Sequence, residues 1–274
     1  MRFALLFMPF WLLVSQSSLA STPVSYPILG SGSNDSTFSA QVAISTSPPM
    51  LNLVAEGPVR LEAMMMEALH AQQPILSTLQ VDWQRAALFT LTTPLTRQTP
   101  VLERLTKQQD KVSEVQARAW EQLRNQLRRS EFAQREFIPL DPDVIRVVDR
   151  HNPLLKGHFA LHLPLLSDQT SVSVWGAVNE PTRFEWQANF GAKDYAQQAQ
   201  WINPRLSTVV VIQPNGDVQS HPVGYWQSQS LPIQPGAIIY VPFTRSLLAS
   251  LSRSELDQTN QQVVELLRHL LPTE

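Results

Sequence analysis

The chain alternates between two hydrophobic patterns. Short stretches alternate apolar and polar residues, and a few longer stretches have apolar residues at helical spacing. Apolar positions three and four residues apart predict helices over 61–69, 101–134, 191–200 and 254–271. Alternation and short β-branched runs predict strands at 51–53, 86–94, 144–148, 159–163, 172–178, 209–212, 218–221 and 238–241. Both periods occur along the whole chain, so the pattern predicts an α+β fold.

Turn-forming residues divide the second half of the chain into one compact unit. The tripeptide NEP at 179–181 closes a strand, and PNGD at 214–217 is a strong hairpin signal. A helix between them is expected to turn Tyr195 and Ala199 inward. Strand, turn, helix, hairpin and final strand predict a small β-grasp-like unit over 166–246.

The longest periodic segment runs from Val101 to Gln134 and lies between predicted strands. A helix of this length indicates an insertion, which could fold back as a hairpin near 107–110. Its apolar stripe comprises Leu102, Leu105, Val112, Val115, Ala119, Leu123 and Leu127, with Trp120 beside it. The arginines off this stripe form either a solvated helix face, which is the simpler interpretation, or a basic groove for an anionic polymer: Arg118, Arg124, Arg128 and Arg129.

A faint internal repeat connects the two halves of the chain. AEGPVR at 55–60 resembles VNEPTR at 178–183, and each follows a predicted strand and carries Pro-x-Arg before a predicted helix. The resemblance predicts two copies of one unit. The first copy, 48–165, would then be enlarged by a helical insertion over 100–136.

The last predicted helix, 254–271, has one apolar stripe that something must cover, because each buried leucine contributes about 1.5–3 kcal/mol. Ser254 is expected to cap the first turn. The stripe either packs on this chain's own β unit or docks on a partner, and we do not expect the short, mixed-charge helix to span a membrane alone. The candidate docking residues are Leu256, Val263, Leu266, Leu267 and Leu270, with Leu271 beside them and Asp257, Gln261, Glu265 and Arg268 opposite.

The beginning of the chain has the pattern of an export signal. Arg2 precedes an apolar run over 3–14, and SLA at 18–20 provides the small residues that a signal peptidase reads. We therefore expect residues 1–20 to be a cleaved signal peptide, followed by an extension or linker over 21–47. The chain has no cysteine, so the protein is not expected to be a lipoprotein, and a bacterial periplasm fits best.

Composition excludes some classes of function. The formal net charge is −2, so there is no broad basic field to attract nucleic acid. Three consecutive methionines at 64–66 are expected on the core face of a helix rather than at a metal. His158 and His162 lie four residues apart on a predicted strand, about 13 Å, too far to share one ion. We expect no metal site and no cofactor.

Three polar residues in one stretch are candidates for a binding site. Asp141, Asp143 and Arg146 lie in the segment DPDVIRV, with Arg146 on a predicted strand. Arg146 could bind a ligand or partner, or it could fix the turn by bonding backbone carbonyls or Asp143. Asp141 followed by Pro142 is most simply a turn.

Several of these segments together resemble a known family. VSVWGAVNEP (172–181), IQPNGDV (212–218) and LPIQPGAIIYVP (231–242) resemble the SLBB-type β-grasp repeats of outer-membrane polysaccharide exporters, although Ala237 stands where those repeats usually carry an acidic residue. With DPDVIRVVDRHNPLLKGHFALHLP (141–164), the long helix and the apolar tail, residues 48–274 resemble the GfcC family of capsule biosynthesis proteins.

The resemblance implies two β-grasp domains, a helical insertion in the first and a C-terminal amphipathic helix. It also implies a periplasmic role in capsule or exopolysaccharide assembly, without an established enzymatic reaction. The implied partners are polysaccharide and the outer-membrane polysaccharide export machinery.

Two classes of function remain open. The first is a non-catalytic accessory protein, which we favour. The second is a glycan-modifying enzyme such as a hydrolase, which would need two carboxylates about 5–10 Å apart in a cleft. Tryptophans that could stack on sugar rings, although a core position is the default, are Trp83, Trp175, Trp186, Trp201 and Trp226.

Overall fold

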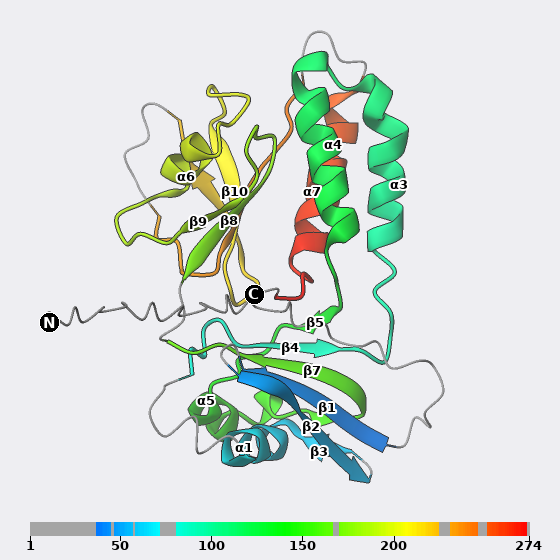
Figure 1. Ribbon diagram of the computed structural model, residues 1–274, viewed down its shortest axis with the longest axis vertical. Coiled ribbons are helices and arrows are strands. Elements are labelled where there is room, and N and C mark those ends of the chain that lie inside the picture. Colours follow the sequence, from blue (N-terminus) through cyan, green and yellow to red (C-terminus); the bar gives the residue numbers. More distant parts are fainter. Residues whose placement is uncertain are drawn as a thin grey trace, which may run out of the picture.

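Two five-stranded mixed sheets, one above the other, form the framework of the protein, and a layer of three helices stands beside the upper sheet (Figure 1). The computed structural model describes residues 37–44, 47–56, 58–71, 81–166, 170–224, 231–245 and 251–272. The expected signal peptide and Trp226 lie outside the described residues. Each sheet with its helices forms one unit, the first around the lower sheet and the second around the upper sheet. Both units contain helices and strands, so the predicted α+β class is confirmed.

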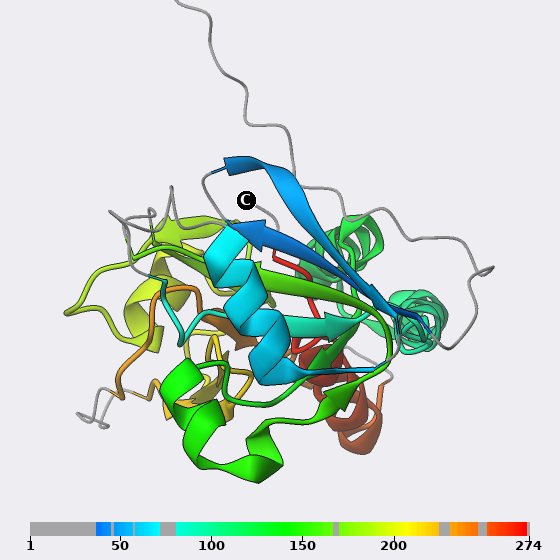
Figure 2. The same cartoon turned by 90° about the horizontal axis from the view of Figure 1, so that it is seen from below.

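The first sheet has the order β2-β1-β7-β4-β5, in which β1 and β7 are parallel and the other pairs are antiparallel. Helices α1 (Leu61–Ala71) and α5 (Pro142–Val147) lie on the face that points away from the second unit (Figure 2). A short ladder of β3 (Val59–Arg60) and β6 (Leu154–Leu155) accompanies them. The five strands are β1 (Thr37–Ile44), β2 (Ser47–Glu56), β4 (Ala87–Thr90), β5 (Gln134–Glu136) and β7 (Gly157–Leu163).

Strand β1 lies inside the segment 21–47, which the sequence pattern assigned to an extension or linker. It pairs in parallel with β7 from Phe38 opposite Gly157 to Ile44 opposite Leu163, and β2 pairs on its other side. The expectation of a linker was therefore wrong for these residues. The alternation in TFSAQVAI is weak because small and polar residues interrupt it, so it did not reveal a strand.

The second sheet has the order β11-β10-β12-β8-β9, with β8 and β12 parallel. Helix α6 (Ala192–Gln198) follows β9, and its Tyr195 and the following Ala199 are buried as predicted. The predicted strands and the PNGD turn of this unit are also confirmed. The strands are β8 (Ser171–Gly176), β9 (Arg183–Glu185), β10 (Thr208–Ile212), β11 (Val218–Pro222) and β12 (Ile238–Val241).

Both sheets have the same connectivity. In each, the first two strands form an antiparallel pair, a helix follows, and the last strand returns to lie parallel to the first. The expected duplication thus appears in the topology, while the β-grasp description itself stays a prediction. The repeated Pro-x-Arg is not an equivalent position, however: Arg60 precedes helix α1, whereas Arg183 opens strand β9.

The helical insertion replaces a tight turn. Between β4 and β5 of the first unit lie α3 (Gln98–Gln108), the 3-10 turn η1 (Gln109–Lys111) and α4 (Glu114–Arg129), where the second unit has only the PNGD turn between β10 and β11. The chain reverses direction at η1, close to the hairpin predicted near 107–110. Val115, expected on the apolar stripe, is 71% exposed, because the turn before α4 shifts the helical phase.

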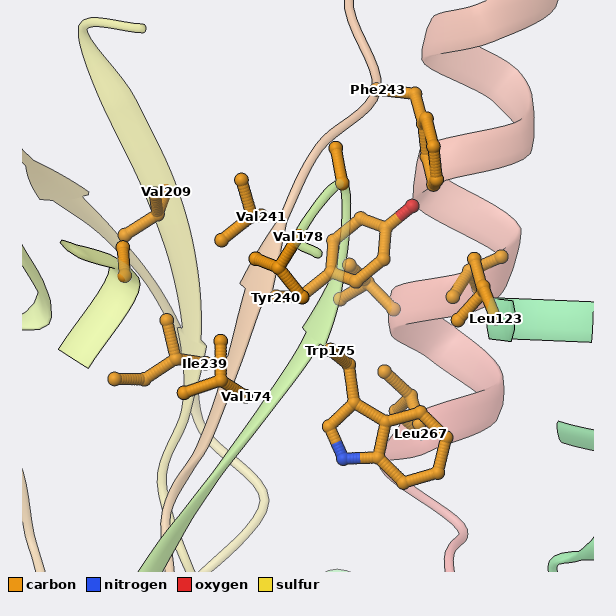
Figure 3. Packing of buried hydrophobic residues seen from close by; sticks show 14 of the residues in the cluster. Leu123, Val174, Trp175, Val178, Val209, Ile239, Tyr240, Val241, Phe243 and Leu267 are labelled. Atoms are coloured by element: carbon orange, nitrogen blue, oxygen red, sulfur yellow. The ribbon is translucent and has the colours of Figure 1, made fainter. Parts of the chain in front are cut away.

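The insertion belongs to the core of the second unit. Leu105, Trp120 and Leu123 of the helical hairpin join one buried cluster with residues of β8, β10 and β12. Alternation along the strands places Val174 and Ile239 on one face, and Trp175 and Tyr240 on the face toward α7 (Figure 3). The first unit thus reaches over to cover the second.

Helix α7 (Arg253–Leu267) packs against α3 of the hairpin and against β10 of the second sheet, in the same helical layer as α4 (Figure 1). Ser252, and not Ser254, is the N-cap: its hydroxyl accepts a hydrogen bond from the Glu255 amide, and Glu255 accepts one from the Ser252 amide. The pattern placed the start of the helix two residues late because Ser252 and Ser254 are both capping residues. None of the helices in the described ranges is long and apolar enough to cross a membrane.

Helix α5 replaces the strand predicted over 144–148. Asp141 is its N-cap, accepting a hydrogen bond from the Asp143 amide at 2.9 Å, and Pro142 occupies the first turn. This cap and the proline start a helix, and they outweigh the β-branched residues that follow. Only Ile145 of this short helix is buried.

Candidate functional site

A cleft of about 420 Å³ lies between the two units. Its first wall is the end of the first sheet, including Arg85, Arg135 and His162. Its second wall is the second sheet, including Ser171 and Ser173 of β8 and residues 212–214 at the end of β10. The third wall is apolar and comes from the end of the chain, with Leu267, Leu270, Leu271 and Pro272.

Strand pairing places the polar groups of the first wall on one face. His162 of β7 lies opposite Ala87 of β4, and Phe89 of β4 lies opposite Arg135 of β5. Alternate residues of a strand point to the same side, so Ala87, Phe89, Ala160 and His162 share the face toward the second unit, while Leu88 and Leu161 face the core below.

Positive charge dominates this cleft. Its lining includes Arg85, Arg135 and Arg183, and none of the described side chains that line it is acidic. Arg183, at the start of β9, is exposed at the second wall. The cleft therefore offers guanidinium groups, hydroxyl groups and an apolar surface to a ligand.

Arg135 lies at the centre of the junction between the units. Its Nη2 donates to the carbonyl of Pro214, and its guanidinium lies 5.9 Å from the Phe89 ring centroid and 5.8 Å from that of Phe137. Burial, and then the charge of Arg268, lowers the pKa of Arg135 to about 10. Arg135 is therefore still cationic at neutral pH. No carboxylate in the described part of the chain forms an ion pair with it.

Arg85 is held rigidly at the rim. Its Nε is 2.8 Å from Asp82 Oδ2, and its Nη2 donates to the Leu165 carbonyl at 2.7 Å. Gly236 of the second unit packs directly on it, since a Cβ at position 236 would come within 3.0 Å of Arg85 Cδ. The aspartate compensates part of the charge of Arg85.

His162 is neutral in this surrounding. Burial first, and then the nearby charges of Arg85 and Arg135, together lower its pKa to about 4. A neutral imidazole can both donate and accept a hydrogen bond. The sequence pattern suggests no role for His162 other than that of a metal ligand. In the described residues no group of three or more His, Asp or Glu side chains could hold a metal ion.

The end of the chain closes the junction from the side. After α7, the His269 carbonyl accepts a hydrogen bond from the Ala133 amide at 3.1 Å, and the Leu271 amide donates to the Glu131 carbonyl at 3.0 Å. His269 Nδ1 accepts from the Arg135 amide at 3.0 Å. The tail thus fixes the backbone segment that carries Arg135.

The residues proposed from the sequence lie elsewhere. Arg146 is exposed on α5, its Nε 3.7 Å from Glu62 Oε1 of α1, and Asp141 and Asp143 stay at the start of the same helix. This face points away from the second unit (Figure 2). The three residues stay close together, but none of them lines the cleft. Their role in binding is not tested by their position and stays a prediction.

The apolar stripe of α7 is covered by this chain. Leu256, Val263, Leu266 and Leu267 are all at most 3% exposed, and Leu270 packs against the same core. The helix therefore takes the self-packed arrangement, one of the two that the sequence allowed. Leu267 and Leu270 also line the cleft, so they contact both the core and the cleft.

The other groups considered from the sequence are accounted for by packing. Trp175 is buried, and Trp83, Trp186 and Trp201 pack against the cores. Met64 and Met65 are in the first core, while Met66 is half exposed. Arg118, Arg128 and Arg129 of α4 are exposed, and Arg124 bonds Gln109, so none of these arginines lines the cleft.

No pattern in the neighbouring sequence marks the arginines of the cleft as binding residues. Arg85 lies in the turn before β4, Arg135 lies in a three-residue strand and Arg183 opens another. Each is an ordinary polar residue in its own segment. They meet only because the strand order and the contact between the units bring their segments together.

Comparison with known proteins agrees with this architecture. The profile described as capsule biosynthesis GfcC, N-terminal, matches residues 42–164, and the profile described as capsule biosynthesis GfcC C-terminal matches residues 180–272. The chain belongs to the GfcC family. Residues from both matched regions line the cleft of this GfcC protein. Arg85, Arg135 and His162 come from the N-terminal region, and Arg183 comes from the C-terminal region.

A curated relative extends the comparison. The chain is similar to the uncharacterized protein YjbG of Escherichia coli strain K12, with 28% identity over 179 residues, which cover 65% of this chain and 71% of the relative. Family membership connects this GfcC protein with capsule biosynthesis.

Proposed function

We propose that this GfcC-family protein is a non-catalytic periplasmic accessory protein in capsule or exopolysaccharide assembly and export. It binds glycan or the export machinery of the outer membrane through the cleft between its two units. Family membership supports the connection with capsule assembly. The signal-peptide pattern predicted at residues 1–20 supports the location.

The observation that carries the proposal is the chemistry of the cleft. Glycoside hydrolysis normally needs a carboxylic acid and a second carboxylate on either side of the scissile bond. The cleft is lined instead by arginines, a neutral histidine and serine hydroxyls, and none of its described lining side chains is acidic. This set of groups can hold a ligand without supplying that acid and base.

Complementation of a deletion strain tests the function. Cells that lack the protein should release less capsule or exopolysaccharide, and the wild-type chain should restore the amount. Arg135→Gln should fail to restore it, while Arg118→Gln, which removes the same charge from an exposed helix position outside the cleft, should succeed. Normal polymer in the deletion strain would refute the proposed role.

The non-catalytic part of the proposal needs its own measurement. Purified protein is incubated with the isolated polymer, and the size distribution and the composition of the polymer are compared before and after. We expect both to stay unchanged. Shortening or chemical modification of the polymer that persists in repeatedly purified protein would instead identify an enzyme.

A further inference from the structure

We propose that the cleft between the two units binds the carboxylate of an acidic sugar residue, such as a uronic acid, in a polysaccharide chain. Arg135 is the principal contact of the carboxylate, and Arg85 and Arg183 complete the cationic surface. The inference rests on the proposed function and names the class of ligand for its cleft.

The first argument is uncompensated charge. Arg135 is partly buried beside the rings of Phe89 and Phe137, yet the charged neighbour that lowers its pKa is Arg268 and not a carboxylate. Buried charges are normally paired, because an unpaired charge in a poorly solvated site is costly. By contrast, Arg85 has Asp82 and Arg268 has Glu265. A bound anion would supply the partner that Arg135 lacks within the described residues.

The second argument is the hydrogen-bonding capacity of Arg135. A guanidinium carries five N–H groups in a planar fork that matches a carboxylate. The structure shows one hydrogen bond from this group, from Nη2 to the Pro214 carbonyl. This bond fixes the orientation of the fork, and the remaining N–H groups have no acceptor among the described residues. Arg135 is thus fixed in orientation, and its remaining N–H donors are available to a ligand in the cleft that it lines.

The third argument favours a sugar over a bare inorganic anion. The cleft has about 420 Å³, within the range of about 300–1,000 Å³ that is usual for small-molecule sites. Besides the arginines, its lining includes the apolar residues Leu267, Leu270 and Leu271 and the serines Ser171 and Ser173. An acidic sugar has all three matching parts: a carboxylate, hydroxyl groups and an apolar C–H face.

Binding of defined oligosaccharides to the full mature chain tests the inference by isothermal titration calorimetry. The probes are a tetramer of galacturonic acid, the same tetramer with its carboxyl groups reduced to alcohols, and inorganic pyrophosphate. We expect the acidic tetramer to bind, with an affinity that falls as the salt concentration rises, and the reduced tetramer to bind at least tenfold more weakly. Equal binding of both tetramers, or binding of pyrophosphate alone, would overturn the inference.

Variants locate the binding. Arg135→Gln should weaken the acidic tetramer by about tenfold to a hundredfold, the usual effect of losing hydrogen bonds to a charged group, and Arg118→Gln should bind like wild type. Thermal melting checks that each variant is folded, and Arg183→Gln serves as a second variant if Arg135→Gln does not fold. Unchanged affinity in a folded cleft variant would overturn the inference.

The outcomes separate the inference from the proposed function. If Arg135→Gln abolishes polymer export but purified wild-type protein does not bind the acidic tetramer, the ligand assignment is wrong and the role in export stands. If the tetramer binds but the deletion strain exports normal polymer, the ligand assignment stands and the proposed role is wrong.

Discussion

Gly216 lies directly against the ring of Phe137, and a Cβ at position 216 would come within 2.4 Å of the ring atom Cε1. Gly216 is in the tight turn of the second unit, whereas Phe137 follows β5 of the first. Arg268 joins them, since its Nε donates to the Gly216 carbonyl at 2.9 Å and its guanidinium carbon lies 4.2 Å from the Phe137 ring centroid. The turn of one unit is thus docked on the edge of the other, beside the cleft.

Replacing this glycine should loosen the junction. Gly216 has a φ of +91°, which favours glycine, so Gly216→Ala combines backbone strain with the contact on Phe137. We expect a loss of about 1–3 kcal/mol in the free energy of unfolding, measured by urea denaturation. In a Phe137→Ala background the cost should be smaller, because only the strain remains. Strictly additive costs would contradict the contact.

The terminal helix should behave as part of the core. Leu266 is fully buried, so Leu266→Ala should cost about 2–5 kcal/mol in the free energy of unfolding. Leu154→Ala is the matched control, because Leu154 is 49% exposed and its truncation should cost less than about 1 kcal/mol. A small cost at both positions, with polymer export lost in Leu266→Ala, would favour docking of this helix on a partner.

One substitution tests whether Arg146 has a role in export that is independent of the cleft. Its ion pair with Glu62 has a 3.7 Å separation and both side chains are exposed, so Arg146→Ala should change the free energy of unfolding by less than about 1 kcal/mol. If the cleft alone carries binding, polymer export is retained, because Arg146 does not line the cleft. Lost export with unchanged stability would identify the α5 face as a second binding surface.

The stability of the protein should fall in mild acid. The folded-state pKa of His162 is lowered to about 4, so between this value and its usual 6.5 the unfolded chain binds the proton more tightly. The contribution of His162 to stability is therefore full above about pH 6.5, decreases as the pH falls toward 4 and levels off below. Arg85 and Arg135 face the imidazole and oppose its protonation.

Urea denaturation at a series of pH values measures this effect. The buried imidazoles of His221 and His269 also have lowered pKa values, so they add to the slope. His162→Asn isolates the contribution of His162: the variant should lose less stability than wild type between pH 6.5 and 4. Identical slopes for the two proteins would show that His162 titrates normally in the folded state.

Processing of the amino terminus is a further test. If residues 1–20 are a cleaved signal peptide, the protein recovered from the periplasm of its native host begins at Ser21. Mass spectrometry of the intact protein measures this directly. Retention of residues 1–20 would contradict the predicted cleavage.

Local patterns determined much of the fold. Alternation and turn chemistry located the strands of the second unit, because the PNGD turn and the β-branched run before it act within a few residues. The same local reasoning failed at α5, where the cap formed by Asp141 and Pro142 decided the structure. It also missed β1, which is stabilised by pairing with β7, far away in the sequence.

By itself the sequence determined the mixed fold class, the two related units, the helical insertion, the amphipathic tail and the family. Only the tertiary structure decided that the insertion and the tail cover the second unit, and that Arg85, Arg135, His162 and Arg183 meet in one cleft. The reason is physical: a helix or strand period reports which face of a segment is apolar. The meeting of charged residues from separate strands depends on strand order and on the docking of the two units, which no local period encodes.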